Sequence, residues 1–437
     1  MNKKRQFLQF VIPSIASMIV FSLYTMVDGI YVARFVGETA LSAVNISLPY
    51  ISFIFAFSIL FSVGTSTVVA IYRGENNEQR GNEIFTINTI FLSITSIMIT
   101  ILAHSHIDEL ATFLGASKEL MPAVKEYLQT IVWFTFFFIV AYSMEVLVKT
   151  DGHPKLATAA IVVGAITNIV MDFVLVVVFP FGLRGAAIAT GLSQVVTFVV
   201  LFGHFFFKHS NIKLCKTSFD ISIYKRIVPI GVADFITELS AGVIVFLFNH
   251  AILKYIGENG IVTYTIITYV YNLIMMTFTG ISQGMQPLVS FYKGQKRSDI
   301  CRTFLHYAIY SSFALSIVAL GICLFGAPLI VSIFVDRSVV PLFQDSVDAM
   351  RIFSLCYLVI GYNIVFSGYF AAIEKSRYSF IISLLRGFVL IAASIVILGY
   401  LFEGDGIWYA TLLCESITLL FSGSFMWKQR EQSKLQG

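Results

Sequence analysis

Long runs of apolar residues follow one another along the whole chain, separated by short polar segments. Each run has about 20 residues or more, the length that an α-helix needs to cross a hydrocarbon core about 30 Å thick. The pattern therefore predicts an all-α integral membrane protein with twelve transmembrane helices. The predicted spans are 7–33, 42–71, 84–105, 122–148, 157–180, 185–207, 222–253, 261–291, 302–325, 347–373, 378–402 and 406–427.

The composition leaves little room for a soluble domain. Of the 437 residues, 57% are hydrophobic and only 12% are charged, whereas soluble domains carry roughly 25% charged residues. The first apolar run follows Lys3, Lys4 and Arg5. It is too long for the apolar region of a signal peptide, and it ends without a small-residue cleavage pattern. We expect it to remain as the first helix.

Lys and Arg are concentrated in alternate polar segments, and these are the segments that would lie on the same side as the N-terminus. Because cytoplasmic loops carry an excess of Lys and Arg, we expect a multi-pass protein of the cell inner (plasma) membrane with both termini in the cytoplasm. The net charge of +4 is then a topology signal and gives no support for a nucleic-acid partner. The five cysteines lack metal-ligand spacing, so no metal or cofactor is expected.

The two halves of the sequence resemble each other at a nearly constant offset. Three glycines recur 220 residues later, and a Gly-Ala-Thr pattern recurs 221 residues later. Internal repeats of this kind are frequent in transporters. The matching residues are Gly37 with Gly257, Gly64 with Gly284, Gly74 with Gly294, Gly185 with Gly406, Ala189 with Ala410 and Thr190 with Thr411.

Each half holds six spans, an even number, so both halves would begin and end on the same side of the membrane. The repeat is then parallel, with its axis along the membrane normal. We expect two six-helix lobes and a cleft between them for a substrate, although duplicated channels and receptors would carry the same repeat. The predicted division is 1–207 for an N-lobe, 208–226 for a basic cytoplasmic linker, 227–427 for a C-lobe and 428–437 for a cytoplasmic tail.

Six ionisable residues lie inside predicted spans. A charged side chain near the middle of a bilayer costs on the order of 2.5–3.5 kcal/mol on insertion scales, so each of these residues needs a partner or a function. For Glu145 and Glu415 we favour a structural or interfacial role. The six are Asp28, Glu145, Asp172, Glu238, Arg386 and Glu415.

Asp28 and Asp172 are the stronger candidates for an ion or proton site. Tyr24 and Tyr31 flank Asp28 at helical spacing, although Asp28 could also be an acid that reaches the interface at a helix end. Asn168 and Asp172 lie four residues apart in an apolar run. The alternative for this pair is a structural hydrogen bond to a neighbouring helix.

The seventh span places Asp234 and Glu238 on one face of a helix, with Glu238 deeper in the membrane. Neither Asp28 nor Glu238 has a charged counterpart in the other half, so the two lobes differ chemically. Arg386 is expected to pair with an acid or to cap a helix end rather than to contact a substrate, although it remains a candidate residue of the cavity. Gln283 lies one turn before Pro287, which should kink the eighth span.

The sequence contains no P-loop, dinucleotide-binding glycine pattern or nucleophile elbow. A nucleotide-driven pump or a membrane hydrolase is therefore disfavoured, and we expect a protein that is not an enzyme. An ion gradient is the remaining source of energy for transport.

Several segments resemble the multidrug and toxic compound extrusion (MATE) transporters over nearly the whole chain. They include VDGIYVARFVGETALSAVN, TDGHPKLATAAIVVGAITNIVMDFV, GLRGAAIATGLSQ, ITELSAGVIVFLFN and ISQGMQPLVSFYKG. Within this family the sequence resembles the small bacterial drug-efflux members, or the DNA-damage-inducible type, more than the vibrio sodium-coupled type. The resemblance implies twelve helices in two lobes, and export of organic cations or other drugs in exchange for H⁺ or Na⁺.

The resemblance also implies roles for particular residues. The ion or proton coupling residues of the family fall on Asp28, Asn168, Asp172 and Glu238, and its polar position in the sixth helix falls on Thr190. The frequent Pro after the acid of the fifth helix is Phe173 here, and the fourth helix has MEVLVKTDG where Asn and Arg are common. A different bend of the fifth helix is therefore expected.

The resulting hypothesis is that ion or proton uptake at Asp28, shared with Asp172, competes with substrate in a cavity between the lobes. The candidate residues of that cavity are Tyr24, Tyr31, Thr190, Asp234, Gln283 and Arg386. One chain contains both lobes, so we expect a monomer. The alternative function is that of a flippase for lipid-linked oligosaccharide, which shares the two-lobe architecture but usually needs a more cationic cavity.

Overall fold

A computed structural model of the chain describes residues 2–206 and 210–435, and every regular element in these two ranges is a helix. Among the described residues, eleven helices are long and apolar enough to cross a membrane. The bent pair α12 (Val340–Ser354) and α13 (Tyr357–Ala372), with an angle of 42° between its two helices, makes a twelfth span. The prediction of an all-α membrane fold with twelve spans is confirmed. Residue 207 of the predicted N-lobe, residues 208–209 of the predicted linker and residues 436–437 of the predicted tail lie outside the described ranges.

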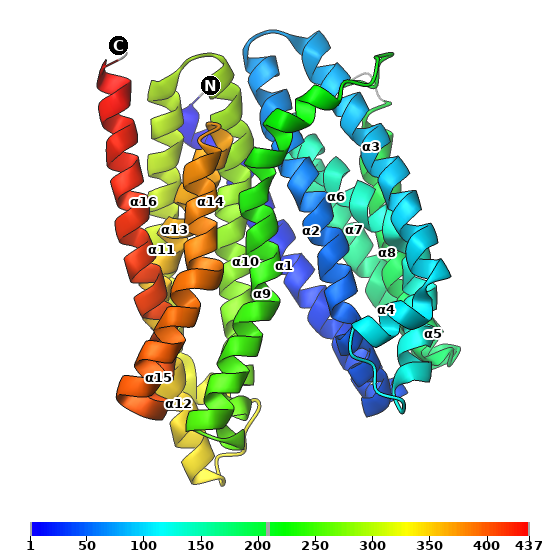
Figure 1. The fold of residues 1–437 in the computed structure, drawn as a ribbon, viewed down its shortest axis with the longest axis vertical. Helices are drawn as coiled ribbons and strands as arrows, with labels where there is room; N and C mark the ends of the chain where they lie inside the picture. The colour runs from blue at the N-terminus through cyan, green and yellow to red at the C-terminus, as the bar shows by residue number, and fades with distance from the viewer. Residues whose placement is uncertain (1, 207–209, 436–437) are drawn as a thin grey trace.

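The first six spans form one lobe, which is blue to teal in Figure 1. The fourth span is interrupted by a 3₁₀ turn, and π-helical turns end the first and fifth spans. The elements of this lobe are α1 (Lys3–Tyr31) with η1 (Val32–Val36), α2 (Glu38–Gly74), α3 (Glu78–Ser105), the short α4 (Ile107–Phe113), α5 (Met121–Ile131) with η2 (Val132–Phe134) and α6 (Thr135–Thr150), α7 (Pro154–Asp172) with η3 (Phe173–Val178), and α8 (Gly182–His204).

The last six spans form the second lobe, green to red in Figure 1. Helix α15 is broken at Glu403, where φ is 51° and ψ is −134°, so the eleventh span ends there. Besides α12 and α13, the elements of the second lobe are η4 (Ile221–Ile223) with α9 (Tyr224–Tyr255), α10 (Glu258–Gly294), α11 (Ser298–Val331), α14 (Ser376–Leu384) with η5 (Leu385–Val389) and α15 (Leu390–Trp408), and α16 (Ala410–Leu435).

The backbone repeats itself at the offset that the sequence predicts. Gly37 and Gly257 precede α2 and α10 with φ values of 119° and 97°, a region that residues with a Cβ rarely adopt. Asn76 and Lys296, also 220 residues apart, both have φ of 59° after the same two helices. The internal repeat therefore extends from sequence similarity to turn geometry.

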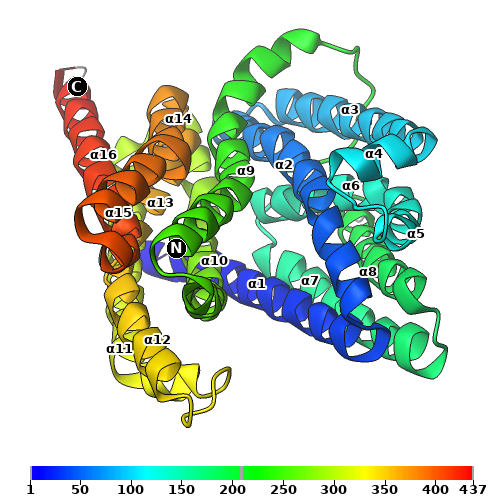
Figure 2. The ribbon, with the colours of Figure 1, turned by 60° about the horizontal axis from the view of Figure 1, so that its bottom comes forward.

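Each lobe has its own apolar core, but the two lobes exchange helix segments. Phe7 and Val11, at the start of α1, belong to the core of the second lobe. Ile223, Ile227 and Ile230, at the start of α9, belong to the core of the first. Figure 2 shows α1 running from one lobe to the other. This exchange joins the lobes near the end of the molecule where both termini lie, which we call the terminal end (Figure 1).

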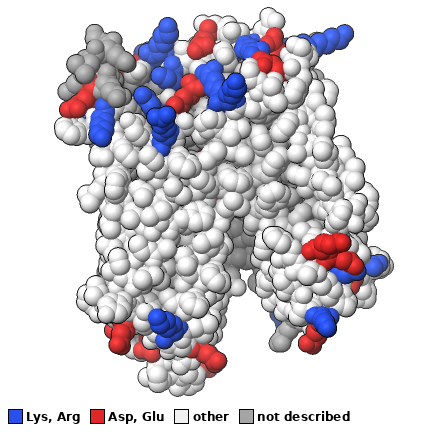
Figure 3. Space-filling model, viewed as in Figure 1, with Lys and Arg blue, Asp and Glu red and all other residues white. Residues whose placement is uncertain are grey.

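Repeat-related glycines form the contact between the exchanged helices. A Cβ added at Gly64 in α2 would collide with the backbone of Ile227 in α9, and one at Gly284 in α10 would approach the backbone of Val11 in α1. Their close approach seals the lobes against each other in the half of the molecule nearer the terminal end. At four other glycines, an added Cβ would also meet the backbone of a helix from the other half: Gly74 meets Phe291, Gly294 meets Ile71, Gly231 meets Leu60 and Gly280 meets Ile15. At the opposite end, a hollow separates the lobes (Figure 3).

Candidate transport site

Asp28 and Asp172 both lie where a regular helix changes into a π-helical turn. Asp28 is in the last turn of α1, shortly before η1, and Asp172 is the last residue of α7, directly before η3 at Phe173. The two π-helical turns contact each other. Turns of this kind inside helices occur frequently at functional sites. At Phe173 the α-helical course of the fifth span gives way to the π-helical turn η3.

The carboxyl groups of Asp28 and Asp172 approach each other without a hydrogen bond of regular geometry. Asp172 and Asn168 are fully buried, and neither their side-chain oxygens nor Asp28 Oδ1 has a hydrogen-bond partner among the described residues. Buried polar groups are nearly always hydrogen-bonded, and two adjacent carboxylates repel each other. This group of oxygens can therefore take up a proton or a cation, which would relieve both the repulsion and the missing bonds.

Aromatic and amide side chains surround the two acids. The Tyr24 hydroxyl lies beside the Gln194 amide and close to Asp28, and Tyr127 lies close to both acids. Thr190 lies one turn before Gln194 and donates a hydrogen bond to the Ala186 carbonyl at 3.1 Å. Tyr31 instead stacks on Phe35, with 5.8 Å between ring centroids. Of the two tyrosines expected beside Asp28, Tyr24 is the one whose hydroxyl lies near the carboxyl group.

Tyr127 and Gln194 were not predicted as site residues from the sequence. Tyr127 lies in MPAVKEYLQ, where a tyrosine near a helix end is typical of the membrane interface. Gln194 follows Thr190 by four residues, which places both on one face of α8. That spacing was the available signal for Gln194. For Tyr127 no local pattern indicates the site, because α5 reaches it only through the packing of the lobe.

Asp234 and Glu238, on α9, form a second acidic group that faces the first lobe. Both lie close to Tyr142 on α6, as does Glu145. Asp234 Oδ2 is buried and has no hydrogen-bond partner among the described residues. The structure thus brings acids of the second lobe toward a tyrosine of the first, at a position apart from the Asp28 and Asp172 pair.

Lys149 directly follows the predicted span 122–148, and its side chain is buried inside the structure. Its side chain is 3% exposed and forms an ion pair of 2.5 Å with Glu145 one turn earlier on α6. It also donates to Gln283 of α10 at 3.4 Å, across the boundary between the lobes. Beside these residues and Pro287 is a void of about 20 Å³, which has room for about one water molecule. The lobes are closed here.

Arg386 is held within the second lobe by Glu415. Its guanidinium donates to Glu415 Oε1 at 2.8 and 3.1 Å. Asn363 donates to the other carboxylate oxygen at 2.8 Å, and Ser422 donates to Asn363 at 2.9 Å. Removing one partner of a buried ion pair costs roughly 3–5 kcal/mol because the other charge is left uncompensated. The arrangement is that of a structural ion pair.

Among the described residues, the possible ligand atoms of Asp151, His153 and His204 lie within 4.8 Å of one another, close enough to hold a metal ion. The Asp151 oxygens, however, already accept from His204 at 2.8 Å and from the backbone N–H groups of Asn211 and Ile212 at 3.1 Å. A metal ion would have to replace these bonds. The geometry instead fits a clamp that fastens the segment after α8 to the first lobe.

Both lobes match one family. A family model described as MatE matches residues 13–174 and again residues 232–397. The chain belongs to the MatE family. The resemblance seen in the sequence is thereby confirmed, and with it a multi-pass membrane transporter that is not an enzyme. The two matched regions correspond to the two copies of the internal repeat.

Relatives of this MatE chain include two described as multidrug export protein MepA. The protein from Staphylococcus aureus (strain bovine RF122 / ET3-1) is 23% identical over 418 residues, which cover 92% of this chain and 90% of the relative. The protein from Staphylococcus haemolyticus (strain JCSC1435) is 23% identical over 412 residues, with coverage of 92% and 89%.

Solved structures of related transporters share the fold along the whole chain. The outward-facing conformation of a multidrug resistance MATE family transporter of the MOP superfamily has a TM-score of 0.93 at 23% identity, covering 100% of this chain and 97% of the other. A MOP superfamily transporter from Pyrococcus furiosus has a TM-score of 0.92 at 23% identity, with the same coverage. These likenesses establish the two-lobe architecture.

Proposed function

We propose that this MatE protein is a secondary active antiporter that exports organic cations and other lipophilic drugs in exchange for H⁺ or Na⁺. The observation that carries the proposal is the pair of facing acids, Asp28 and Asp172: Asp28 Oδ1 and both Asp172 carboxylate oxygens are buried and have no hydrogen-bond partner among the described residues. The description of its relatives as multidrug export proteins supports drugs as the substrates.

The coupling ion and the substrate compete for the same negative charge. When the carboxyl pair holds no ion, it attracts a cationic substrate; when it takes up H⁺ or Na⁺, the attraction is lost and the substrate is released. Asn168 lies one turn from Asp172 and offers an amide oxygen to Na⁺. Asp234, Glu238 and Gln283 act at the boundary between the lobes, where they respond to lobe movement.

The energy needed for this exchange is within reach of two buried acids. Moving a two-state equilibrium from 1:99 to 99:1 takes about 5.5 kcal/mol of differential binding. Ionising a buried carboxyl group beside a like charge involves energies of several kcal/mol, because burial and repulsion both oppose the second charge. One ion bound or released at the pair can therefore drive alternation of the lobes.

The terminal end is the cytoplasmic end in this proposal. Lys and Arg gather at that end on the face seen in Figure 3, as expected for cytoplasmic segments. The hollow at the opposite end then opens to the outside. The contacts of Gly64, Gly284 and Lys149 keep the cytoplasmic side closed. We therefore assign the conformation as outward-facing, and a single chain as the transporting unit.

The flippase alternative requires cationic groups in the cavity. Arg386, the arginine that the sequence analysis found within a span, is engaged by Glu415 at 2.8 Å in the second lobe. Lys149 is likewise engaged by Glu145. Neither is free to bind a phosphate, which favours the antiporter over the flippase.

The function is tested with purified protein in proteoliposomes. A pH gradient and a Na⁺ gradient are imposed separately while ethidium movement across the membrane is followed by fluorescence. We expect one of the two gradients to drive ethidium at least fivefold faster than in liposomes without a gradient. If neither gradient accelerates movement for any of several cationic dyes, the chain is not a secondary drug antiporter.

A further inference from the structure

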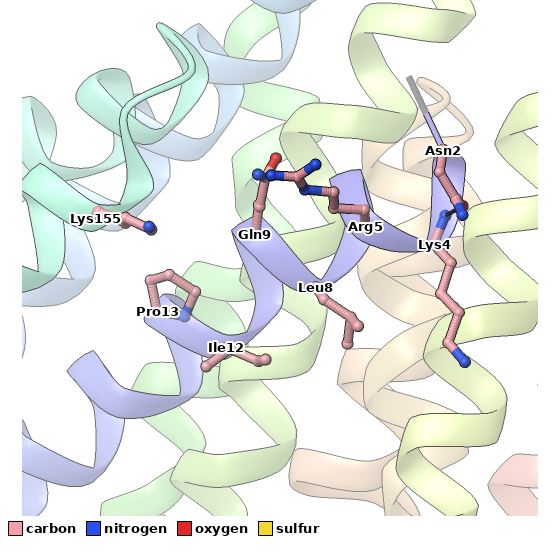
Figure 4. A pocket seen from close by; sticks show the side chains of 8 residues that line it. All are labelled: Asn2, Lys4, Arg5, Leu8, Gln9, Ile12, Pro13 and Lys155. Carbon is pink, nitrogen blue, oxygen red and sulfur yellow. Dashed lines mark hydrogen bonds between the residues drawn. The ribbon is translucent and has the colours of Figure 1, made fainter.

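We propose that a basic cavity at the terminal end of α1 binds the headgroup of an anionic phospholipid. The cavity has a volume of about 400 Å³ and lies between the beginning of α1 and Lys155 at the beginning of α7 (Figure 4). Its lining comes from residues 2–13 and Lys155 and includes none of the acids of the transport site. Nothing in the transport mechanism uses it.

Three cationic side chains, Lys4, Arg5 and Lys155, line this cavity. All three are exposed, and none has a carboxylate partner among the described residues. The first turn of α1 also contains no acid. In Figure 4, Lys155 extends from α7 toward α1 and Arg5 lies beside Gln9 on the side of α1 nearer Lys155, whereas Lys4 extends from the far side of the same helix turn. Like charges gathered without a counterion attract an anion, and Arg is particularly suited to the planar recognition of phosphate oxygens.

Apolar side chains continue the cavity toward the membrane. Leu8 and Ile12 are 38% and 58% exposed, so both side chains can contact acyl chains. They follow Lys4 at intervals of four residues, so the three lie along one face of α1. A free phosphate ion would need only the cations, whereas a lipid would place its phosphate on them and its chains against Leu8 and Ile12. Basic residues over an apolar face are a recognised feature of anionic lipid sites.

The position of the cavity gives a bound lipid a structural consequence. The beginning of α1 packs in the core of the second lobe through Phe7 and Val11, while Lys155 belongs to α7 of the first lobe. Thr158 of α7 donates to the Pro13 carbonyl of α1 at 2.8 Å, just inside the cavity. A headgroup held by both helices would therefore join the lobes at the terminal end. With the orientation proposed above, this lipid belongs to the cytoplasmic leaflet.

Native mass spectrometry tests the site on the full chain in detergent. The protein is incubated with equal amounts of phosphatidylglycerol and phosphatidylcholine, and the lipids retained on it are counted. We expect the wild type to retain phosphatidylglycerol at least threefold over phosphatidylcholine, and the variant Lys4→Gln/Arg5→Gln/Lys155→Gln to lose this preference. The control Lys216→Gln/Lys225→Gln/Lys296→Gln removes the same charge from exposed positions outside the cavity and should keep it.

A single variant and a competition with phosphate complete the experiment. Lys155→Gln alone leaves the N-terminal charges that orient the first helix and should reduce the preference by about half; if it and the triple variant both match the wild type, the site is excluded. Inorganic phosphate at millimolar concentration should not displace the lipid. Complete displacement would identify a free-anion site and overturn the lipid proposal. Because the readout is lipid retention, its result is independent of the gradient experiment.

Discussion

Asp172→Asn is expected to lower ethidium export more than tenfold while leaving the fold intact, and Asp28→Asn is expected to do the same. The two carboxyl groups lie close together and carry buried oxygens, so replacing one by a neutral amide removes the charge that distinguishes the ion-bound state from the substrate-bound state. The same change relieves the repulsion between like charges. Thermal stability should therefore stay constant or rise.

Export is measured in cells that lack other drug pumps, with expression checked by immunoblot and stability checked by thermal unfolding in detergent. Asp345→Asn is the matched control, because it makes the same chemical change at an exposed position and should export as the wild type does. Full export by Asp28→Asn and Asp172→Asn at normal expression would remove both acids from the mechanism. A loss of export accompanied by a clear loss of stability would make their role structural.

The second large effect is expected at the closed contact between the lobes. In Gly231→Ala the added Cβ would collide with the backbone carbonyl of Leu60 in α2. Neither backbone can yield easily, and overpacking typically costs 1–3 kcal/mol. A cost of one or two kcal/mol shifts a two-state ratio by a factor of about 5–30. We therefore expect the lobes to separate at the terminal end and export to fall about tenfold.

Double electron–electron resonance between spin labels at Glu78 and Ser298 measures this separation. The two positions are exposed and lie at the first residue of α3 and of α11, 220 residues apart. Gly242→Ala is the control, because no atom lies within 4 Å of its added Cβ, while it gains the same helix propensity. The label distance should lengthen in Gly231→Ala and stay unchanged in Gly242→Ala. An unchanged distance and full export in Gly231→Ala would mean that the glycine contact does not control the lobes.

The sequence predicts the spans well because the physics of a bilayer acts on each segment separately. An apolar run of sufficient length must become a helix, whatever its neighbours are. The repeat is equally local, since Gly37 and Gly257 hold the same positive φ at the start of equivalent helices. These features need no knowledge of packing, and for that reason the twelve spans and the two-lobe fold follow from the pattern alone.

The site is only partly predictable, because its residues meet through contacts between distant segments. Asp28 and Asp172 stand out as acids in apolar runs, but their approach to each other depends on how α1 packs against α7. Tyr127 is indistinguishable in sequence from an interfacial tyrosine. Lys149 looks like a loop residue, and its burial becomes understandable only with Glu145 one turn before it and Gln283 on another helix.

The exchange of helix segments between the lobes could not be predicted from the sequence either. Phe7 and Val11 are apolar residues in an apolar run, and nothing in the run states which core they enter. The repeat-matched glycines indicated that the two halves are alike. They gave no sign that Gly64 and Gly284 would each face a helix of the other half.

The central claim, that the ion and the drug compete for the Asp28 and Asp172 carboxyl groups, is tested most directly by equilibrium binding of ethidium to purified protein. Binding is titrated by fluorescence at alkaline pH, at acidic pH, and with added Na⁺. We predict that either acidic pH or Na⁺ weakens ethidium binding at least tenfold in the wild type, and that neither affects the residual binding of the double variant Asp28→Asn/Asp172→Asn. The account is contradicted if the double variant binds ethidium as tightly as the wild type with the same dependence on the ion.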